Sequence, residues 1–539
     1  MKFLYFSIYM LIGMAALAQP CPIIPQPNSA KAITEEFTLT ERTVISYNGV
    51  EIQPLANFLQ ADLLKSVGQT AIIGKLRVSG GIHLEFVKKL RAQTGEAYVL
   101  TVGRKGTTIS ATSSHGLFNG INSFLQLIRL GQKNVGKKTI RIAGWEINDE
   151  PRFEWRGILL DESRHFFGMS TVKELLDWMA FYKLNKFHWH LTDEPAWRIE
   201  IKSYPKLTQV GSTGSFDDPL APANYYTQEQ IKEIVAYAGA RFIDVIPEID
   251  MPGHATAANR AYPAFSGGGS SKHPEFTFNP GLDTTYRYLS SILREADALF
   301  PSNMVHIGGD EVSFGNEKWN SILEVKKLMN SQRLRDLIAV EHYFSARMAD
   351  TLYKLNNKVL LWDEAADTNL PRDKTQIFWW RHDHPEQLKK ALDKGFATVL
   401  CPRLPFYFDF KQDSTQRYGR TWGKAFVSLD KLYGFNLNDL QLSEKQRSHI
   451  LGVQAGIWTE FIPSKAKLQY MLFPRITALA ETGWTQDARK DLQNFYSRVA
   501  MHTRLYREAG IYYYERQNPK LTPEPLTSEQ ITDPARAQQ

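Results

Sequence analysis

The sequence predicts an α/β protein, a (β/α)8 TIM barrel preceded by a small α+β domain. Eight short apolar runs alternate with longer segments of helical periodicity. These runs are Arg156–Asp161, Lys186–Leu191, Phe242–Ile249, Val305–Gly308, Val359–Trp362, Gln376–Trp380, Ala397–Cys401 and Gly452–Trp458. Eight parallel strands separated by helices are the pattern of a closed barrel. An open doubly wound sheet would carry a glycine-rich phosphate loop after its first strand, and Gly157 alone does not make one.

Five segments between these runs place apolar residues on one helical face, as expected for helices that cover a barrel. They are Val172–Tyr182, Gln228–Ala238, Thr284–Leu299, Leu334–Leu355 and Pro385–Lys394. The barrel domain is therefore assigned to residues 149–485. Residues 486–539 predict one further helix, Leu492–Glu508, and a polar tail that lacks the apolar content to fold on its own.

Residues 22–148 predict the small α+β domain. Short β-prone runs at Thr43–Tyr47, Tyr98–Val102 and Thr107–Ala111 precede an amphipathic helix from His115 to Leu130. No cluster of catalytic residue types occurs in this part. The site of any chemistry is therefore expected in the barrel.

The N-terminus predicts an exported protein. Residues 1–18 read as a signal peptide, with Lys2 before an apolar run and Ala16 and Ala18 at a small-x-small cleavage site. No later run is long enough to span a membrane. A periplasmic or cell-surface location of bacterial type is therefore expected. Lipid attachment at Cys21 stays open as an alternative, although Pro20 fits a lipoprotein cleavage site poorly.

Composition excludes several other classes of protein. The net charge of +7 is spread over 539 residues without a dense Lys/Arg block, so no nucleic-acid partner is expected. Cys21 and Cys401 are the only cysteines, so no disulfide framework is expected. Neither CxxC nor HExxH occurs, and no cofactor or metal is predicted. The oligomeric state is left open.

Polar and aromatic side chains follow the predicted strands, at the end of a barrel where active sites lie. The candidates are Arg164, Asp193, His254, Asp310, Glu311, Trp362, Trp380, Tyr407, Asp409, Trp458 and Glu460. So many such groups on one rim have no structural explanation, and they predict an active site. His188, His190 and His306 are instead expected lower in the barrel as hydrogen-bonded packing. No supporting carboxylate is evident from the sequence, so these histidines do not predict a metal site.

Three motifs in this order resemble the β-N-acetylhexosaminidases of glycoside hydrolase family 20. They are the segments 156–166 (RGILLDESRHF), 188–193 (HWHLTD) and 308–311 (GGDE), and the likeness runs from about Pro22 to Trp484. The resemblance implies an exo-acting, retaining hydrolase without a cofactor. Its partner would be a glycan that ends in a β-linked N-acetylglucosamine or N-acetylgalactosamine.

The central pair is Asp310-Glu311. Two carboxylates that flank a scissile bond must face each other across the sugar, whereas adjacent residues leaving a strand diverge. Family 20 avoids this difficulty by substrate-assisted catalysis, in which the sugar's own acetamido oxygen attacks C1 and forms an oxazolinium. The resemblance implies that Glu311 is the acid/base, that Asp310 orients the acetamido group, and that Tyr407 donates to the acetamido oxygen.

The other candidates follow from the same resemblance. Trp362, Trp380 and Trp458 would enclose the acetamido group, with Trp380 favoured over its neighbour Trp379. Arg164, Glu460 and Asp409 would grip the sugar hydroxyls, while Asp193 and His254 would tune the acid. Arg381 and Arg403 are noted as cations for a 6-sulfated sugar, and gluco or galacto preference stays open. Two alternatives remain, a carbohydrate-binding protein without catalysis and a retaining glycosidase with a protein nucleophile.

Overall fold

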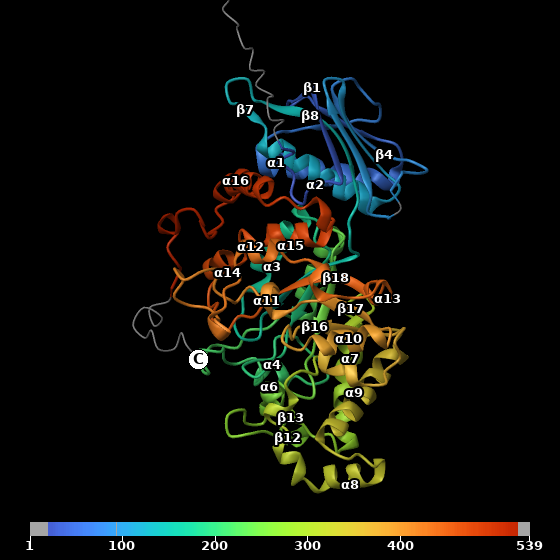
Figure 1. Ribbon diagram of the computed structural model, residues 1–539, viewed down its shortest axis with the longest axis vertical. Helices are drawn as coiled ribbons and strands as arrows, with labels where there is room; N and C mark the ends of the chain where they lie inside the picture. The colour runs from blue at the N-terminus through green and yellow to red at the C-terminus, as the bar shows by residue number, and fades with distance from the viewer. Residues whose placement is uncertain (1–19, 93, 527–539) are drawn as a thin grey trace, which may run out of the picture.

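The computed structural model describes residues 20–92 and 94–526, so the predicted signal peptide and the end of the polar tail lie outside the described residues. Two units are packed together (Figure 1), an N-terminal sheet domain and a barrel. The sheet domain ends with β8 at Asp149, and the barrel begins with β9 at Trp155. In the described part of the chain, no helix combines the length and the hydropathy needed to cross a bilayer.

The N-terminal domain is one mixed sheet whose strands run in the order β1-β8-β5-β6-β4-β2-β3, with β7 added beside β8. The strands are β1 (Ser29–Leu39), β2 (Val44–Tyr47), β3 (Ile72–Ile73), β4 (Gly81–Phe86), β5 (Tyr98–Gly103), β6 (Gly106–Ala111), β7 (Gln132–Asn134) and β8 (Thr139–Asp149). Strand β6 alternates buried and half-buried residues because only one of its faces packs against a helix.

Two helices, α1 (Gln53–Val67) and α2 (Ser114–Leu130), lie between this sheet and the barrel (Figure 1). Ser113 begins α2 by accepting a hydrogen bond from the backbone N–H of Gly116. The sequence predicts α2 as an amphipathic helix, but even its polar residues Asn122, Ser123 and Gln126 are buried. They are buried because the face opposite the sheet packs against the barrel and its C-terminal helix.

The second unit is a closed barrel of eight parallel strands in the order β10-β11-β14-β15-β16-β17-β18-β9. These strands are β9 (Trp155–Asp161), β10 (Lys186–His190), β11 (Asp244–Glu248), β14 (Met304–His306), β15 (Lys358–Trp362), β16 (Thr375–Trp379), β17 (Ala397–Leu400) and β18 (Ile450–Ile457). Each of the eight predicted runs overlaps one of them, with the start of the strand displaced by at most two residues. The predicted fold, a TIM barrel after an α+β domain, is confirmed.

The longer helices of this unit are α3 (Gly168–Phe181), α5 (Gln228–Gly239), α7 (Asp283–Asp297), α8 (Leu323–Gln332), α9 (Leu337–Lys354), α10 (Pro385–Asp393), α14 (Lys465–Leu472), α15 (Arg475–Trp484) and α16 (Leu492–Glu508). Shorter elements lie in the connections: α4 (Lys206–Gln209), α6 (Thr256–Ala261), β12 (Ser266–Gly268), β13 (Thr277–Phe278), α11 (Arg403–Phe406), α12 (Leu429–Tyr433) and α13 (Glu444–Arg447). The described connection between β15 and β16 has a 3-10 turn, Asp363–Asp367, in place of an α-helix. Pro371 disfavours helical geometry at the residue before it, so it limits how far a helix could extend in this connection.

The lead-in segment from Pro20 to Asn28 is embedded between the two units. Ile23 and Ile24 are fully buried, and Gln126 of α2 both donates to and accepts from the backbone of Ile24. From α16, Arg498 donates to the carbonyl oxygen of Ile23 while pairing with the buried Glu481 of α15. The segment therefore joins the sheet domain, the barrel and the C-terminal helix.

His502 of α16 completes this contact. Its Nε2 lies 2.9 Å from the carbonyl oxygen of Pro22, which can only accept, so Nε2 carries the proton. The Tyr182 hydroxyl then donates to Nδ1 at 3.0 Å. Burial lowers the pKa of His502 to about 3, and this ring is therefore neutral in the folded protein.

This arrangement predicts a pH dependence of stability. Below about pH 6.5 the unfolded chain takes up a proton at His502 that the folded chain excludes, so stability falls by up to about 1.4 kcal/mol per pH unit. The variant His502→Gln should lose less in melting temperature between pH 7 and pH 5 than the wild type. Parallel melting curves for the two proteins over this range would contradict this assignment.

Candidate active site

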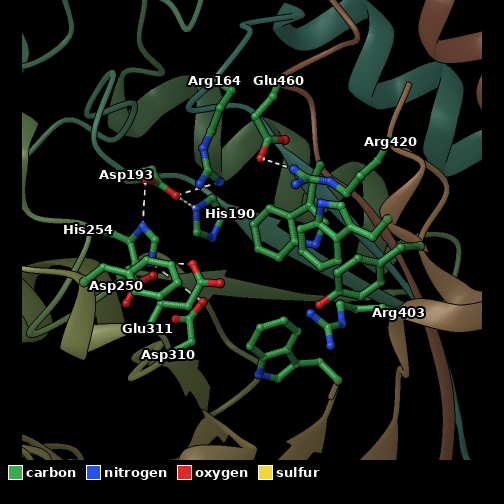
Figure 2. A pocket seen from close by; sticks show the side chains of 15 residues that line it. Arg164, His190, Asp193, Asp250, His254, Asp310, Glu311, Arg403, Arg420 and Glu460 are labelled. Atoms are coloured by element: carbon green, nitrogen blue, oxygen red, sulfur yellow. Dashed lines mark hydrogen bonds and ion pairs between the residues drawn. The ribbon is translucent and has the colours of Figure 1, made fainter. Parts of the chain in front are cut away.

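A pocket of about 420 Å³ opens at the C-terminal end of the barrel strands. It is lined by Arg164, His190, Asp193, Asp250, His254, Asp310, Glu311, Phe314, Trp380, Arg403, Tyr407, Arg420, Trp422, Trp458 and Glu460 (Figure 2). Nine of the eleven candidate residues are among them. The roles assigned to these residues remain predictions.

The Asp310-Glu311 pair leaves β14 through Gly308 and Gly309, both of which have positive φ. A Cβ atom at Gly308 would lie 1.8 Å from Oδ1 of Asp250, so only glycine permits this close approach. Glu311 itself has φ 53°. The turn thus places the two acidic side chains together on one side of the pocket (Figure 2).

Asp310 lies where a carboxylate is hard to ionise. Burial, followed by the negative charge of Asp250, raises the pKa of Asp310 well above its usual range. Burial raises the pKa of Asp250 to about 7. Oδ1 of Asp310 is buried and has no hydrogen-bond partner in the described structure. An unpaired buried acceptor beside a pocket is poised for a donor carried by a ligand.

His254 connects this pair to Asp193. Its Nδ1 lies 3.1 Å from Oδ1 of Asp193, and its Nε2 lies 3.8 Å from both Oδ2 of Asp310 and Oε2 of Glu311. Burial alone would lower the pKa of His254, but the charges of Asp193, Asp250 and Asp310 raise it well above its usual range. A charged imidazolium therefore faces the two carboxylates.

Asp193 also binds Arg164 on the other side. Nη1 of Arg164 lies 2.6 Å from Oδ2 of Asp193, and the guanidinium lies 5.4 Å from the centroid of the Trp458 ring. Despite burial, the charges of Arg164 and His254 hold the pKa of Asp193 well below its usual range. Asp193 is thus a fixed negative charge between two cations.

A second arginine, Arg420, organises the far side of the pocket. Its Nε donates to Oδ2 of Asp409 at 2.8 Å, and Nη2 donates to Oε1 of Glu460 at 2.7 Å. Although Glu460 is buried, Arg420 and Arg164 lower its pKa. Oε2 of Glu460 has no hydrogen-bond partner among the described atoms, so it is available to a ligand.

The apolar wall is aromatic. The rings of Trp380 and Tyr407 are parallel, with centroids 6.5 Å apart and an interplanar angle of 7°, and Trp458 lies 6.1 Å from Tyr407. The adjacent Trp379 points into the core, where its Nε1 donates to the carbonyl oxygen of His384. The preference for Trp380 over Trp379 therefore agrees with the placement of the two rings.

Two candidates are not among the pocket-lining residues. Trp362 is 2% exposed and lies beneath the pocket, where its Nε1 donates to Oε1 of Glu248 at 2.9 Å. Asp409 is fully buried behind Arg420. As placed, neither side chain lines the pocket, although Oδ1 of Asp409 is buried without a hydrogen-bond partner in the described structure.

Six lining residues are not among the eleven candidates: His190, Asp250, Phe314, Arg403, Arg420 and Trp422. The expectation that His190 lies below the site as packing was wrong, because its ring reaches the pocket, and Arg403 was named only as a possible cation for a sulfated sugar. Asp250 and His190 follow or end predicted strands and could have been found by that criterion. Arg420 and Trp422 lie in the long connection between β17 and β18, where periodicity gives no signal. Arg403 reaches the pocket and lies between the rings of Trp380 and Trp422.

Arg381, noted with Arg403 as a possible cation for a sulfated sugar, is engaged elsewhere. Its Nε donates to Oδ1 of Asp363 at 2.6 Å, and it is not among the pocket-lining residues. The carboxylate of Glu364 beside it accepts from the Trp380 indole at 3.2 Å. Arg381 and its acidic partners therefore lie behind Trp380 and support it.

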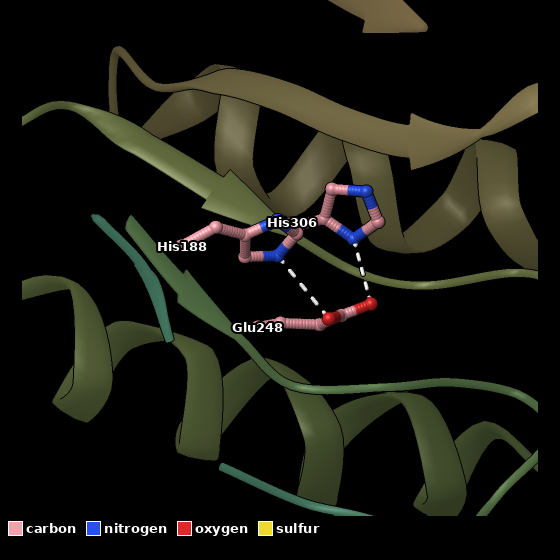
Figure 3. A group of neighbouring side chains, drawn as sticks. All are labelled: His188, Glu248 and His306. Atoms are coloured by element: carbon pink, nitrogen blue, oxygen red, sulfur yellow. Dashed lines mark ion pairs between the residues drawn. The ribbon is translucent and has the colours of Figure 1, made fainter. Parts of the chain in front are cut away.

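Below the pocket, His188, Glu248 and His306 form a buried cluster that could hold a metal ion (Figure 3). The expectation that these histidines lack a supporting carboxylate was wrong, because Glu248 lies between His188 and His306. However, each oxygen of Glu248 already faces an N–H group: Oε1 faces the indole of Trp362, and Oε2 faces the ring of His190. Hydrogen bonding therefore accounts for this cluster without an ion.

Comparison with known proteins decides the family. Residues 153–487 match glycosyl hydrolase family 20, catalytic domain, and residues 20–150 match its domain 2. The chain belongs to glycoside hydrolase family 20. The match covers most of the chain, so the membership extends to both units of the fold.

Several family 20 proteins are similar over most of this chain. A β-hexosaminidase of Porphyromonas gingivalis is 33% identical over 88% of the chain, which spans 62% of that relative's length. An exo β-N-acetylglucosaminidase of Vibrio harveyi, solved in complex with N-acetylglucosamine, has a TM-score of 0.84 at 32% identity, covering 91% of this chain and 78% of that one. A Streptomyces plicatus N-acetyl-β-hexosaminidase has a TM-score of 0.80 at 28% identity, covering 92% and 97%.

The placement of the adjacent tryptophans in this family 20 pocket gives a test. Trp380→Leu removes a ring that lines the pocket and should weaken binding of the probe N-acetylglucosamine about tenfold, or about 1.4 kcal/mol. Trp379→Leu removes a core ring and should lower the melting temperature while leaving affinity near that of the wild type. Calorimetric titration and thermal melts of both variants measure the two effects. Equal losses of affinity would contradict the placement.

Proposed function

We propose that this chain is an exo-acting, retaining β-N-acetylhexosaminidase that removes terminal β-linked N-acetylglucosamine or N-acetylgalactosamine from glycans by substrate assistance. Membership of family 20 and the names of the similar enzymes support the class of reaction. The observation that carries the mechanism is the environment of Asp310. Its free, buried Oδ1 lies next to the acid candidate Glu311, rather than across a sugar from it.

In the first step the acetamido oxygen of the bound sugar attacks C1, and the bond between C1 and the glycosidic oxygen breaks. Glu311 gives its proton to the departing oxygen, and an oxazolinium ring forms. Asp310 accepts the acetamido N–H and, as an ionised carboxylate, stabilises the positive charge of that ring. The charge developing on the ring in turn favours ionisation of Asp310, which burial opposes in the empty pocket.

The aromatic wall holds the acetamido group for this attack. Trp380 and Trp458 supply apolar faces, and the Tyr407 hydroxyl donates to the acetamido oxygen. The indole N–H of Trp458 donates to the oxygen of the Tyr407 hydroxyl, so the proton of that hydroxyl stays free for the ligand. Correct placement of the attacking oxygen replaces a protein nucleophile.

In the second step water attacks C1 from the side that the aglycone has left. Glu311, now ionised, takes the proton from this water, and the ring opens to restore the acetamido group. Two inversions at C1 give net retention. The same carboxyl group thus serves as acid and then as base.

Exo specificity follows from the closed inner end of the pocket. Arg164 and Glu460 are held by ion pairs there, and both offer groups that a vicinal diol can bind. The exposed rings of Trp422 and Phe314, at 42% and 48% exposure, belong to the open side. One terminal sugar fits the closed end, and the remaining glycan extends outward.

For the location of this protein we propose export, with removal of residues 1–18.

The carboxylate pair supplies the decisive variants. Glu311→Gln removes the acid/base and should lower kcat on a p-nitrophenyl N-acetyl-β-glucosaminide by about 10²- to 10⁴-fold. Asp310→Asn should be nearly as harmful, because an amide cannot balance the charge of the oxazolinium. Steady-state kinetics and circular dichroism of both variants test this assignment. Wild-type turnover by Asp310→Asn would exclude substrate assistance.

Substrate choice separates this proposal from a glycosidase with a protein nucleophile. The wild type should cleave the aryl N-acetyl-β-glucosaminide, whereas the matching β-glucoside, which lacks the attacking oxygen, should be cut at a negligible rate. Comparable rates on the two substrates would support a protein nucleophile instead. Binding of N-acetylglucosamine without any hydrolysis would indicate a carbohydrate-binding protein.

A further inference from the structure

A chain of buried groups extends from the pocket into the barrel core. His190, the last residue of β10, places Nε2 2.9 Å from Oδ2 of Asp193. The Nδ1 atom of the same ring lies 2.5 Å from Oε2 of Glu248, the last residue of β11. Figure 2 shows the pocket end of this chain and Figure 3 shows the surroundings of Glu248.

Both ring nitrogens of His190 must donate, because each faces a carboxylate oxygen. Burial alone would lower the pKa of His190, but the charge of Glu248 and the bonds to Asp193 and Glu248 raise it well above its usual range. The ring is therefore a buried imidazolium between two anions. It cannot turn over without losing both bonds.

Glu248 is a rigid anchor for this ring. Four nitrogen atoms lie within 3.1 Å of its carboxylate: Nδ1 of His190, Nε2 of His188, Nδ1 of His306 and Nε1 of Trp362. All of these residues are at most 2% exposed. Of the three histidines, only His190 contacts Asp193 in the described structure.

We propose that His190 is a positioning residue of the active site, which anchors Asp193 to Glu248 so that Asp193 can hold Arg164 and His254 in place at once. This inference rests on the proposed function. It adds His190 and Glu248 to the groups on which turnover depends, although Glu248 does not line the pocket.

The contacts of Asp193 explain why it needs an anchor. Its Oδ2 binds Arg164 and His190, while its Oδ1 binds His254 and the backbone N–H of Glu194. The torsion that turns a carboxylate about its last bond is soft. Without His190, Asp193 can rotate towards Arg164 and release His254.

Displacement of His254 would reach both members of the carboxylate pair. Its Nε2 is equally distant, at 3.8 Å, from an oxygen of Asp310 and an oxygen of Glu311. Proton transfer to the departing oxygen then becomes less well aligned. Glycosides with poor leaving groups depend most on this transfer.

Two amide variants separate positioning from packing. The amide nitrogen of glutamine can take the place of Nε2 of histidine, and that of asparagine can take the place of Nδ1. His190→Gln should keep a donor to Asp193 and retain activity within about tenfold, whereas His190→Asn should lose about 10- to 100-fold in kcat. The loss in His190→Asn should be larger for a phenyl than for a 2,4-dinitrophenyl N-acetyl-β-glucosaminide.

His188→Asn is the matched control. It removes a nitrogen from the same oxygen of Glu248 but leaves the contact between His190 and Asp193 intact. It should lower the melting temperature without changing the ratio of rates on the two leaving groups. Glu248→Gln keeps the shape of the anchor and removes its charge, so it should shift this ratio in the same direction as His190→Asn.

Equal activities of His190→Gln and His190→Asn, or equal losses on the two leaving groups, would overturn the inference. If His190→Asn does not fold, a folded Glu248→Gln with the wild-type ratio overturns it as well. A wild type that cleaves no aryl N-acetyl-β-glucosaminide defeats the proposed function. If the wild type is active but His190→Gln and His190→Asn do not differ in activity, only the positioning role is excluded.

Discussion

The constraint on which the active site depends is the burial of several negative charges in one small pocket. Asp193, Asp250, Asp310, Glu311 and Glu460 all line it. Like charges in a region of low dielectric repel one another strongly, so they coexist only with cations or protons between them. Arg164, Arg420 and His254 supply these cations, and the loops after the strands are arranged around them.

The five carboxylates are not all paired with these cations. Asp193 and Glu460 are paired and have lowered pKa values, which makes them permanent anions that define the geometry. Asp250 and Asp310 lack a direct arginine partner in the described structure, and their pKa values are raised. The pocket thus combines fixed charge for recognition with adjustable charge for chemistry. That combination suits a reaction in which positive charge appears on the substrate only transiently.

The sequence predicts those parts of the fold and site that depend on local pattern. The eight strands are apolar runs bounded by polar ends, and the Asp310-Glu311 pair follows one of them, so both are predictable from the sequence. Arg420 and Trp422 are not, because they reach the pocket from a long connection whose path depends on packing. Trp362 ends a strand as predicted, yet its indole turns down to Glu248, a choice that only the buried partner determines.

The sheet domain contacts the opposite end of the barrel from the pocket. Glu96 and His115 of this domain face the starts of the barrel strands, including Trp155, Lys186 and Asp244. The lead-in segment and α16 fasten it there. A ligand that extends outward from the pocket therefore points away from this domain, and the loops at the pocket end of the barrel are the parts of the described structure that are placed to contact it.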